Sequence, residues 1–129
     1  MSMNPLVNRY NRDVVLSAPR EKLVVMLYDK ALSNLQQALM SLDREDLSQF
    51  GHHLGKSQAI VAELLNSLDH EAGGDISKNL EKLYLFVIDR LIQANLNKDG
   101  GKIRESIAVL KNLREGFDHA VRQTCTETA

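Results

Sequence analysis

Four histidines are the side chains of this 129-residue chain best suited to hold a metal ion or carry a phosphoryl group: His52, His53, His70 and His119. Metal sites in helical bundles are marked by Glu-x-x-His pairs, whose members share one helix face. The residues three positions before the histidines are Gln49, Phe50, Ser67 and Gly116. With one cysteine, Cys125, and no glycine-rich phosphate loop, we predict no catalytic residue, no metal and no cofactor, and expect solvated histidines.

One histidine lies in a pattern similar to that of histidine phosphotransfer domains, which are four-helix bundles of about this length. That family places its phosphorylated histidine in a His-x-Leu-Lys-Gly-Ser pattern, whereas residues 52–57 read HHLGKS. Position i+4 of a helix lies over position i, so Lys56 would occupy the space above His52 that glycine leaves open in that family. The exchanged positions of lysine and glycine disfavour phosphotransfer. Phosphotransfer through His52 remains the alternative function.

Length and composition favour one small globular domain. The chain is 43% hydrophobic and 26% charged, with a formal net charge of −1, so it lacks the basic balance typical of nucleic-acid binding. No apolar run approaches the roughly 18 residues needed to cross a bilayer. The N-terminus has no signal-peptide pattern, and a lone cysteine suits a reducing compartment. We therefore expect a cytoplasmic protein without membrane insertion.

Helical periodicity appears in four segments, and strand alternation does not. The helices are expected from near Pro19 to residue 42, over 46–70, over 75–97, and over about 102–122. Short loops predict an all-α, antiparallel up-down-up-down four-helix bundle over residues 17–122. A short N-terminal arm, residues 1–16, would lie on the bundle, and residues 123–129 would form a flexible tail.

Apolar residues at alternating spacings of three and four should form the core. The expected core positions include Val24, Leu27, Leu47, Leu68, Ile76, Leu80, Tyr84, Ile107 and Phe117. The stretch HEAGGD at 70–75 is expected to end the second helix before the third begins, because its two glycines tolerate positive φ.

The third helix carries more apolar surface than one core requires. At 100° per residue, four side chains fall outside its core seam: Leu85, Ile88, Ile92 and Leu96. We call these residues the outer stripe. They would either pack against a neighbouring helix of the bundle or bind another chain.

The second helix bears small residues on one face, here called the small-residue strip: Gly51, Gly55, Ala59 and Ala62. Each glycine in a helix costs about 1 kcal/mol relative to alanine, so such residues usually permit a close approach of another backbone. The strip would serve either packing within the bundle or, beside the outer stripe, a groove for an amphipathic helix.

The chain resembles the flagellar secretion chaperone family FliS over about residues 5–120. The points of resemblance are Tyr10, Ala18-Pro19, Leu23, Met26-Leu27-Tyr28-Asp29, Leu68-Asp69, Gly73-Gly74, Ile76, Asn79-Leu80, Leu83-Tyr84 and Leu113-Arg114-Glu115. Two positions depart from the family, which often has glycine at Lys30 and tryptophan at Phe117. Phe117 should still fill core volume.

The resemblance implies a non-enzymatic chaperone of the bacterial cytosol. Such a protein binds the disordered C-terminal segment of flagellin, prevents its premature polymerisation and delivers it to the flagellar export apparatus. The expected groove has Leu85, Ile88, Ile92 and Leu96 on one wall and Gly51, Gly55 and Ala59 on the other. The resemblance further implies that the arm covers the binding surface until flagellin displaces it, and Leu6, Val7 and Tyr10 are the arm residues expected to do so. A homodimer formed through the outer stripe is another possible outcome.

Overall fold

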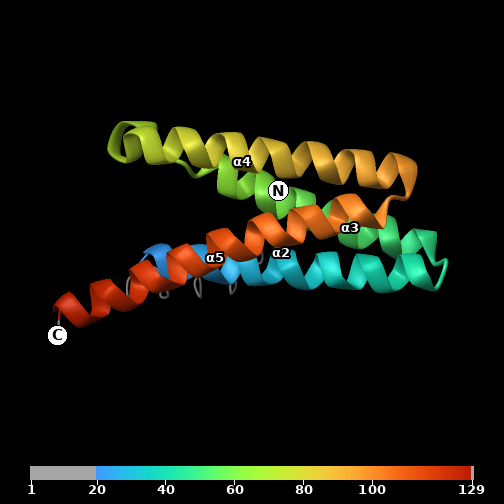
Figure 1. Cartoon of the computed structure of the whole chain (residues 1–129), viewed down its shortest axis with the longest axis horizontal. Coiled ribbons are helices and arrows are strands. Elements are labelled where there is room, and N and C mark those ends of the chain that lie inside the picture. Colours follow the sequence, from blue (N-terminus) through green and yellow to red (C-terminus); the bar gives the residue numbers. More distant parts are fainter. Residues whose placement is uncertain (1–19, 129) are drawn as a thin grey trace, which may run out of the picture.

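The computed structural model describes residues 20–128 and, among them, the side chains of 22–117. The described residues form four helices. They are α2 (Arg20–Asp43), α3 (Leu47–Asn66), α4 (His70–Asn97) and α5 (Gly100–Thr128). The helices run roughly along one long axis (Figure 1). The predicted all-α fold is confirmed. The arm residues Leu6, Val7 and Tyr10 lie outside the described residues.

Each helix packs against two others: α2 and α4 both contact α3 and α5. Side-chain contacts give the antiparallel order. Near the start of α5, a Cβ built on Gly100 would lie 3.5 Å from Leu42 of α2, and the ring of Phe117 further along α5 packs against that of Tyr28 of α2. Lys98, just after α4, lies over the ring of Phe50 near the start of α3. The C-terminal part of α5 extends past the other helices (Figure 1).

The boundary between α3 and α4 differs from the prediction. The second helix ends at Asn66 rather than near residue 70, and Asp69 caps α4 by accepting hydrogen bonds from the backbone N–H groups of Glu71 and Ala72, both at 3.1 Å. The expected stop HEAGGD therefore opens α4. The kink that separates it from the rest of the helix lies at Gly74, with φ 52° and ψ −126°, a conformation that favours glycine.

Asp69→Ala is expected to lower the free energy of unfolding by about 1 kcal/mol, because two backbone donors at the start of α4 would lose their acceptor. Urea unfolding followed by circular dichroism measures this change. Asp75→Ala removes an exposed carboxylate six residues later, just after the kink of α4, and serves as the control. Equal losses from both variants would contradict the capping role.

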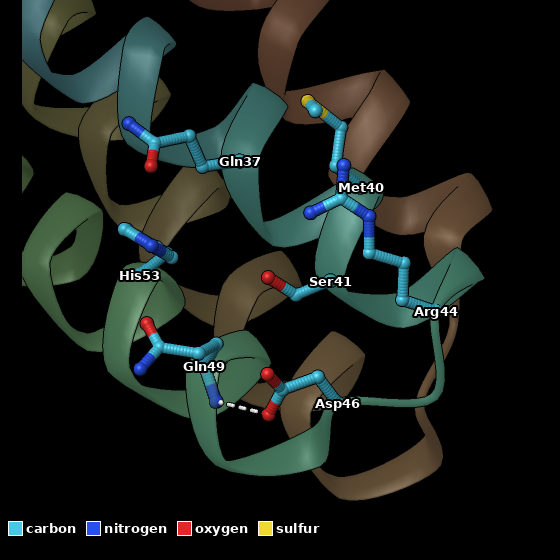
Figure 2. Close-up of a pocket in the computed structure, with 7 residues that line it drawn as sticks. All are labelled: Gln37, Met40, Ser41, Arg44, Asp46, Gln49 and His53. Atoms are coloured by element: carbon cyan, nitrogen blue, oxygen red, sulfur yellow. Dashed lines mark hydrogen bonds between the residues drawn. The ribbon is translucent and has the colours of Figure 1, made fainter.

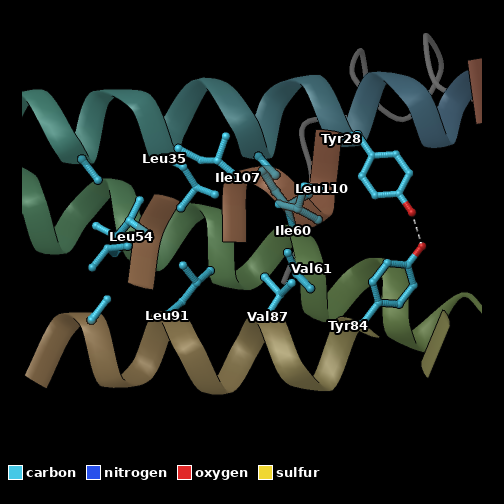
Figure 3. Packing of buried hydrophobic residues seen from close by; sticks show 14 of the residues in the cluster. Tyr28, Leu35, Leu54, Ile60, Val61, Tyr84, Val87, Leu91, Ile107 and Leu110 are labelled. Atoms are coloured by element: carbon cyan, nitrogen blue, oxygen red, sulfur yellow. Dashed lines mark hydrogen bonds between the residues drawn. The ribbon is translucent and has the colours of Figure 1, made fainter. Parts of the chain in front are cut away.

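A hydrogen-bonded tyrosine pair lies at one end of the core. The hydroxyl oxygens of Tyr28 on α2 and Tyr84 on α4 are 2.5 Å apart (Figure 3). Burial raises the pKa of both phenols above its usual value. Tyr84 is an expected core position, whereas Tyr28 is not among the predicted core residues. Phe117 packs against the core and lies 5.7 Å from Tyr28 between ring centroids, as expected for a residue that fills core volume.

Two expected core positions are wrong. Leu47 and Ile76 are exposed, Ile76 by 72%. Leu47 is the first residue of α3, and Ile76 follows the kink of α4. The alternating spacing of apolar residues continues to both positions, but the neighbouring helices do not pack over them.

Candidate partner-binding surfaces

The outer stripe lies mostly on the surface of α4. Leu85, Ile92 and Leu96 are exposed by 50%, 42% and 76%, and Ile88 is half-buried against the core. Packing within the bundle therefore accounts for Ile88 but not for the other three. A row of large exposed apolar side chains on one helix is typical of a surface that contacts another molecule.

The small-residue strip is open as well. Gly55 and Ala59 are exposed, and Gly51 is half-buried. A Cβ atom built on Gly51 or Gly55 would meet no atom within 4 Å outside the local backbone of its own helix. Packing inside the bundle therefore does not require glycine at either position.

The two surfaces flank the same side of the α3–α4 pair. On α3, His53 and Ser57 form hydrogen bonds to α2, and Gly55 lies about 160–200° around the helix from both. On α4, Arg90 pairs with Glu105 of α5, and its Nε lies 3.5 Å from Oε2 of Glu105. Ile88 and Ile92 each lie about 160–200° around α4 from Arg90. Both strips therefore turn away from α2 and α5, and the antiparallel packing of α3 and α4 brings them onto one face.

A second apolar surface, which we call the end cavity, was missed by the sequence analysis. It has a volume of about 440 Å³ and receives side chains from all four helices. Its lining includes Leu23, Val24, Leu27, Leu64, Leu68, Ile76, Leu80, Tyr84 and Phe117. Several of these were expected core residues. Most of them are half-buried or exposed at the end of the bundle, whereas Leu64 and Tyr84 are buried and border the cavity from the core.

A smaller polar cavity of about 210 Å³ lies between α2 and α3 (Figure 2). It is lined by Gln37, Met40, Ser41, Arg44, Asp46, Gln49 and His53. Within it, the carboxylate of Asp46 accepts a hydrogen bond from the backbone of Gln49 and caps α3. The cavity thus surrounds Asp46, which caps α3. Its polar side chains line an open surface.

The structure describes the side chains of His52, His53 and His70, of which the first two contact each other with ring centroids 5.3 Å apart. His53 is half-buried, with Nδ1 2.9 Å from Oδ1 of Asn34, so the expectation of a solvated side chain is wrong there. His52 is exposed, as is Lys56 one turn later. His70 is exposed and pairs with Glu81 at 3.2 Å. Among the described residues, no group of three or more potential ligands is placed to hold a metal ion.

Comparison with known proteins decides the family. The family model described as flagellar protein FliS matches residues 2–124. The chain belongs to the FliS family. It is 39% identical over 104 residues to the flagellar secretion chaperone FliS of Salmonella typhimurium. The matched region covers 80% of this chain and 77% of that protein.

Further FliS relatives match at similar levels. The flagellar secretion chaperone FliSB of Pseudomonas aeruginosa is 34% identical over 81% of this chain and 82% of its own length. The chaperone FliS of Campylobacter jejuni is 33% identical over 91% of both chains. FliS proteins are chaperones rather than enzymes, so the prediction of a non-enzymatic flagellar secretion chaperone is confirmed at the level of the family. No helix within the described range has the length and apolar character needed to span a membrane.

Proposed function

We propose that this FliS chain binds the disordered C-terminal segment of flagellin in the bacterial cytosol, keeps it from polymerising, and delivers it to the flagellar export apparatus. The observation that carries the proposal is the exposed outer stripe beside the small-residue strip. A flagellar secretion chaperone needs such a surface, because a subunit held before assembly still exposes the apolar segments that it will later bury.

The two strips suit an amphipathic helix. Such a helix places apolar side chains at i, i+3, i+4 and i+7, which would pack on Leu85, Ile92 and Leu96. Glycine at Gly51 and Gly55 would let its backbone approach α3 closely. A disordered segment loses conformational entropy when it folds on binding, so a contact along the length of both helices is expected.

In this proposal the arm competes with the client. Leu6, Val7 and Tyr10 would cover the same face in the free protein and leave it when flagellin binds. Replacing Leu6 and Tyr10 with aspartate in the full chain should then raise the affinity for flagellin severalfold, because the client would no longer displace apolar contacts. Unchanged affinity would contradict competition by the arm.

The deciding experiment titrates a flagellin C-terminal peptide into the full chain by calorimetry and follows the mixture by analytical ultracentrifugation. The chaperone proposal expects a saturable complex. A stable homodimer that ignores the peptide would favour the homodimer formed through the outer stripe and would overturn the proposal. Incubation with a phosphorylated response regulator tests the phosphotransfer alternative, which requires an acid-labile label on His52.

A further inference from the structure

One residue of the end-cavity wall belongs to a hydrogen-bonded pair of tyrosine hydroxyls. Tyr84 lines the cavity and is only 1% exposed, and its hydroxyl oxygen lies 2.5 Å from that of Tyr28. Each tyrosine hydroxyl has one proton to donate. A pair of hydroxyls that bond to each other uses one of the two protons. Among the residues that the structure describes, neither hydroxyl has a further partner, so one proton lacks an acceptor.

The distance alone allows either hydroxyl to donate, and we assign the remaining proton to Tyr84. Tyr28 is completely buried and is not part of the cavity wall, so the oxygen of Tyr84 is the acceptor within its reach. If Tyr28 donates to Tyr84, the free proton is on Tyr84, the residue of the pair that lines the cavity.

The other polar side chains of the cavity wall are already engaged. Ser67 donates to the carbonyl oxygen of Leu64 at 2.8 Å, and Ser77 donates to that of Asp69 at 3.0 Å. The carboxylate of Asp69 accepts from the backbone at the start of α4. In the described wall, the Tyr84 hydroxyl is therefore the side-chain donor left available for a molecule in the cavity.

We propose that the Tyr84 hydroxyl donates a hydrogen bond to a backbone carbonyl of the client chain seated in the end cavity, and so selects which part of the client enters it. This inference rests on the proposed function. Carbonyls inside a helix are used by the helix itself, whereas an extended segment or the last turn of a helix has carbonyls to offer. The client part held here is thus extended or helix-terminal, with apolar side chains on both sides of the accepting carbonyl.

The chemistry of the cavity favours a polypeptide. A hydrocarbon ligand would fill the apolar wall but would leave the Tyr84 proton without an acceptor, which carries a free-energy cost in a buried site. A volume of about 440 Å³ lies in the range of ligand sites and accommodates a few apolar side chains. A disordered client brings such side chains together with unpaired backbone carbonyls.

The test compares two matched variants, Tyr84→Phe and Tyr28→Phe, in the full chain. Each removes one hydroxyl from the same pair and keeps the ring. Calorimetric titration with the flagellin C-terminal peptide should show affinity about tenfold lower for Tyr84→Phe, because the client carbonyl loses its donor. Tyr28→Phe should bind within about twofold of the unmodified chain, because Tyr84 keeps its proton. Circular dichroism should show both variants fully helical.

The outcomes separate this inference from the function on which it rests. If the unmodified chain does not bind the peptide, the proposed function fails and this inference fails with it. If the unmodified chain and Tyr84→Phe bind equally well, water accepts the proton and only this inference is overturned. Tighter binding by Tyr84→Phe would also overturn it, because the hydroxyl would then hold the chain's own N-terminal residues in the cavity.

Discussion

Replacing both Leu85 and Ile92 with aspartate is expected to weaken binding of the flagellin C-terminal segment by about 100-fold or more and to leave the bundle folded. Both side chains are about half exposed in the free protein, so their removal takes little from the core. Covering them with a client contributes about 1 kcal/mol or more each, and two carboxylates buried against an apolar helix oppose binding further. Calorimetric titration measures the affinity, and thermal unfolding checks the fold.

The matched control for this variant is Lys111→Asp. Lys111 is exposed and lies on α5, outside the face formed by α3 and α4. The net charge falls by two in both proteins, because Lys111→Asp turns a positive charge into a negative one and the double variant adds two negative charges. If Lys111→Asp weakens binding as much, overall charge rather than the outer stripe determines affinity. Ile88 is left unchanged because it packs against the core.

Replacing both Gly51 and Gly55 with alanine is expected to stabilise the protein and weaken its function. Each substitution in α3 should add about 1 kcal/mol to the free energy of unfolding, because alanine is the better helix former and its Cβ would meet no atom within 4 Å. Two such gains should raise Tm by roughly 6–12 °C in a domain of this size. The new methyl groups would stand where the client backbone approaches, so client affinity should fall by about tenfold or more.

Gly116 offers the control for the glycine variant. It lies on α5, is exposed, and a Cβ built there also meets nothing within 4 Å. Gly116→Ala should therefore stabilise the protein by a similar amount per residue without changing client affinity. If the variant of Gly51 and Gly55 binds the client as well as the unmodified chain does, the small-residue strip is not part of the binding face.

The helical pattern predicted the bundle because it depends on short-range periodicity. Residues at spacings of three and four must share a face, and Phe50, Leu54, Val61 and Leu64 of α3 are indeed buried. The pattern failed at helix ends. It does not tell where the neighbouring helices stop, so Leu47 and Ile76 were assigned to a core that does not reach them.

The same distinction holds for the surface features: a feature of one helix can be predicted from its sequence, whereas a feature formed by several helices cannot. The outer stripe follows from angles on one helix, and the exposure of Leu85, Ile92 and Leu96 fits the prediction that this helix carries excess apolar surface. Its occupant stays a proposal. The end cavity depends on four helices meeting at one end, and the Tyr28–Tyr84 bond joins residues 56 positions apart. Neither follows from the periodicity of one segment.

The packing of α2 against α5 has a consequence for how the chain folds during synthesis. Side chains of α5, the last described helix, pack on α2, the first: Asp29 pairs with Arg114, and the ring of Tyr28 packs against that of Phe117. While the ribosome makes the roughly 75 residues between the end of α2 and residue 117, at about 5–20 residues per second, the α5-facing side of α2 stays without its partner for several seconds. A chaperone of this architecture thus carries uncovered apolar surface of its own until its last helix has been made.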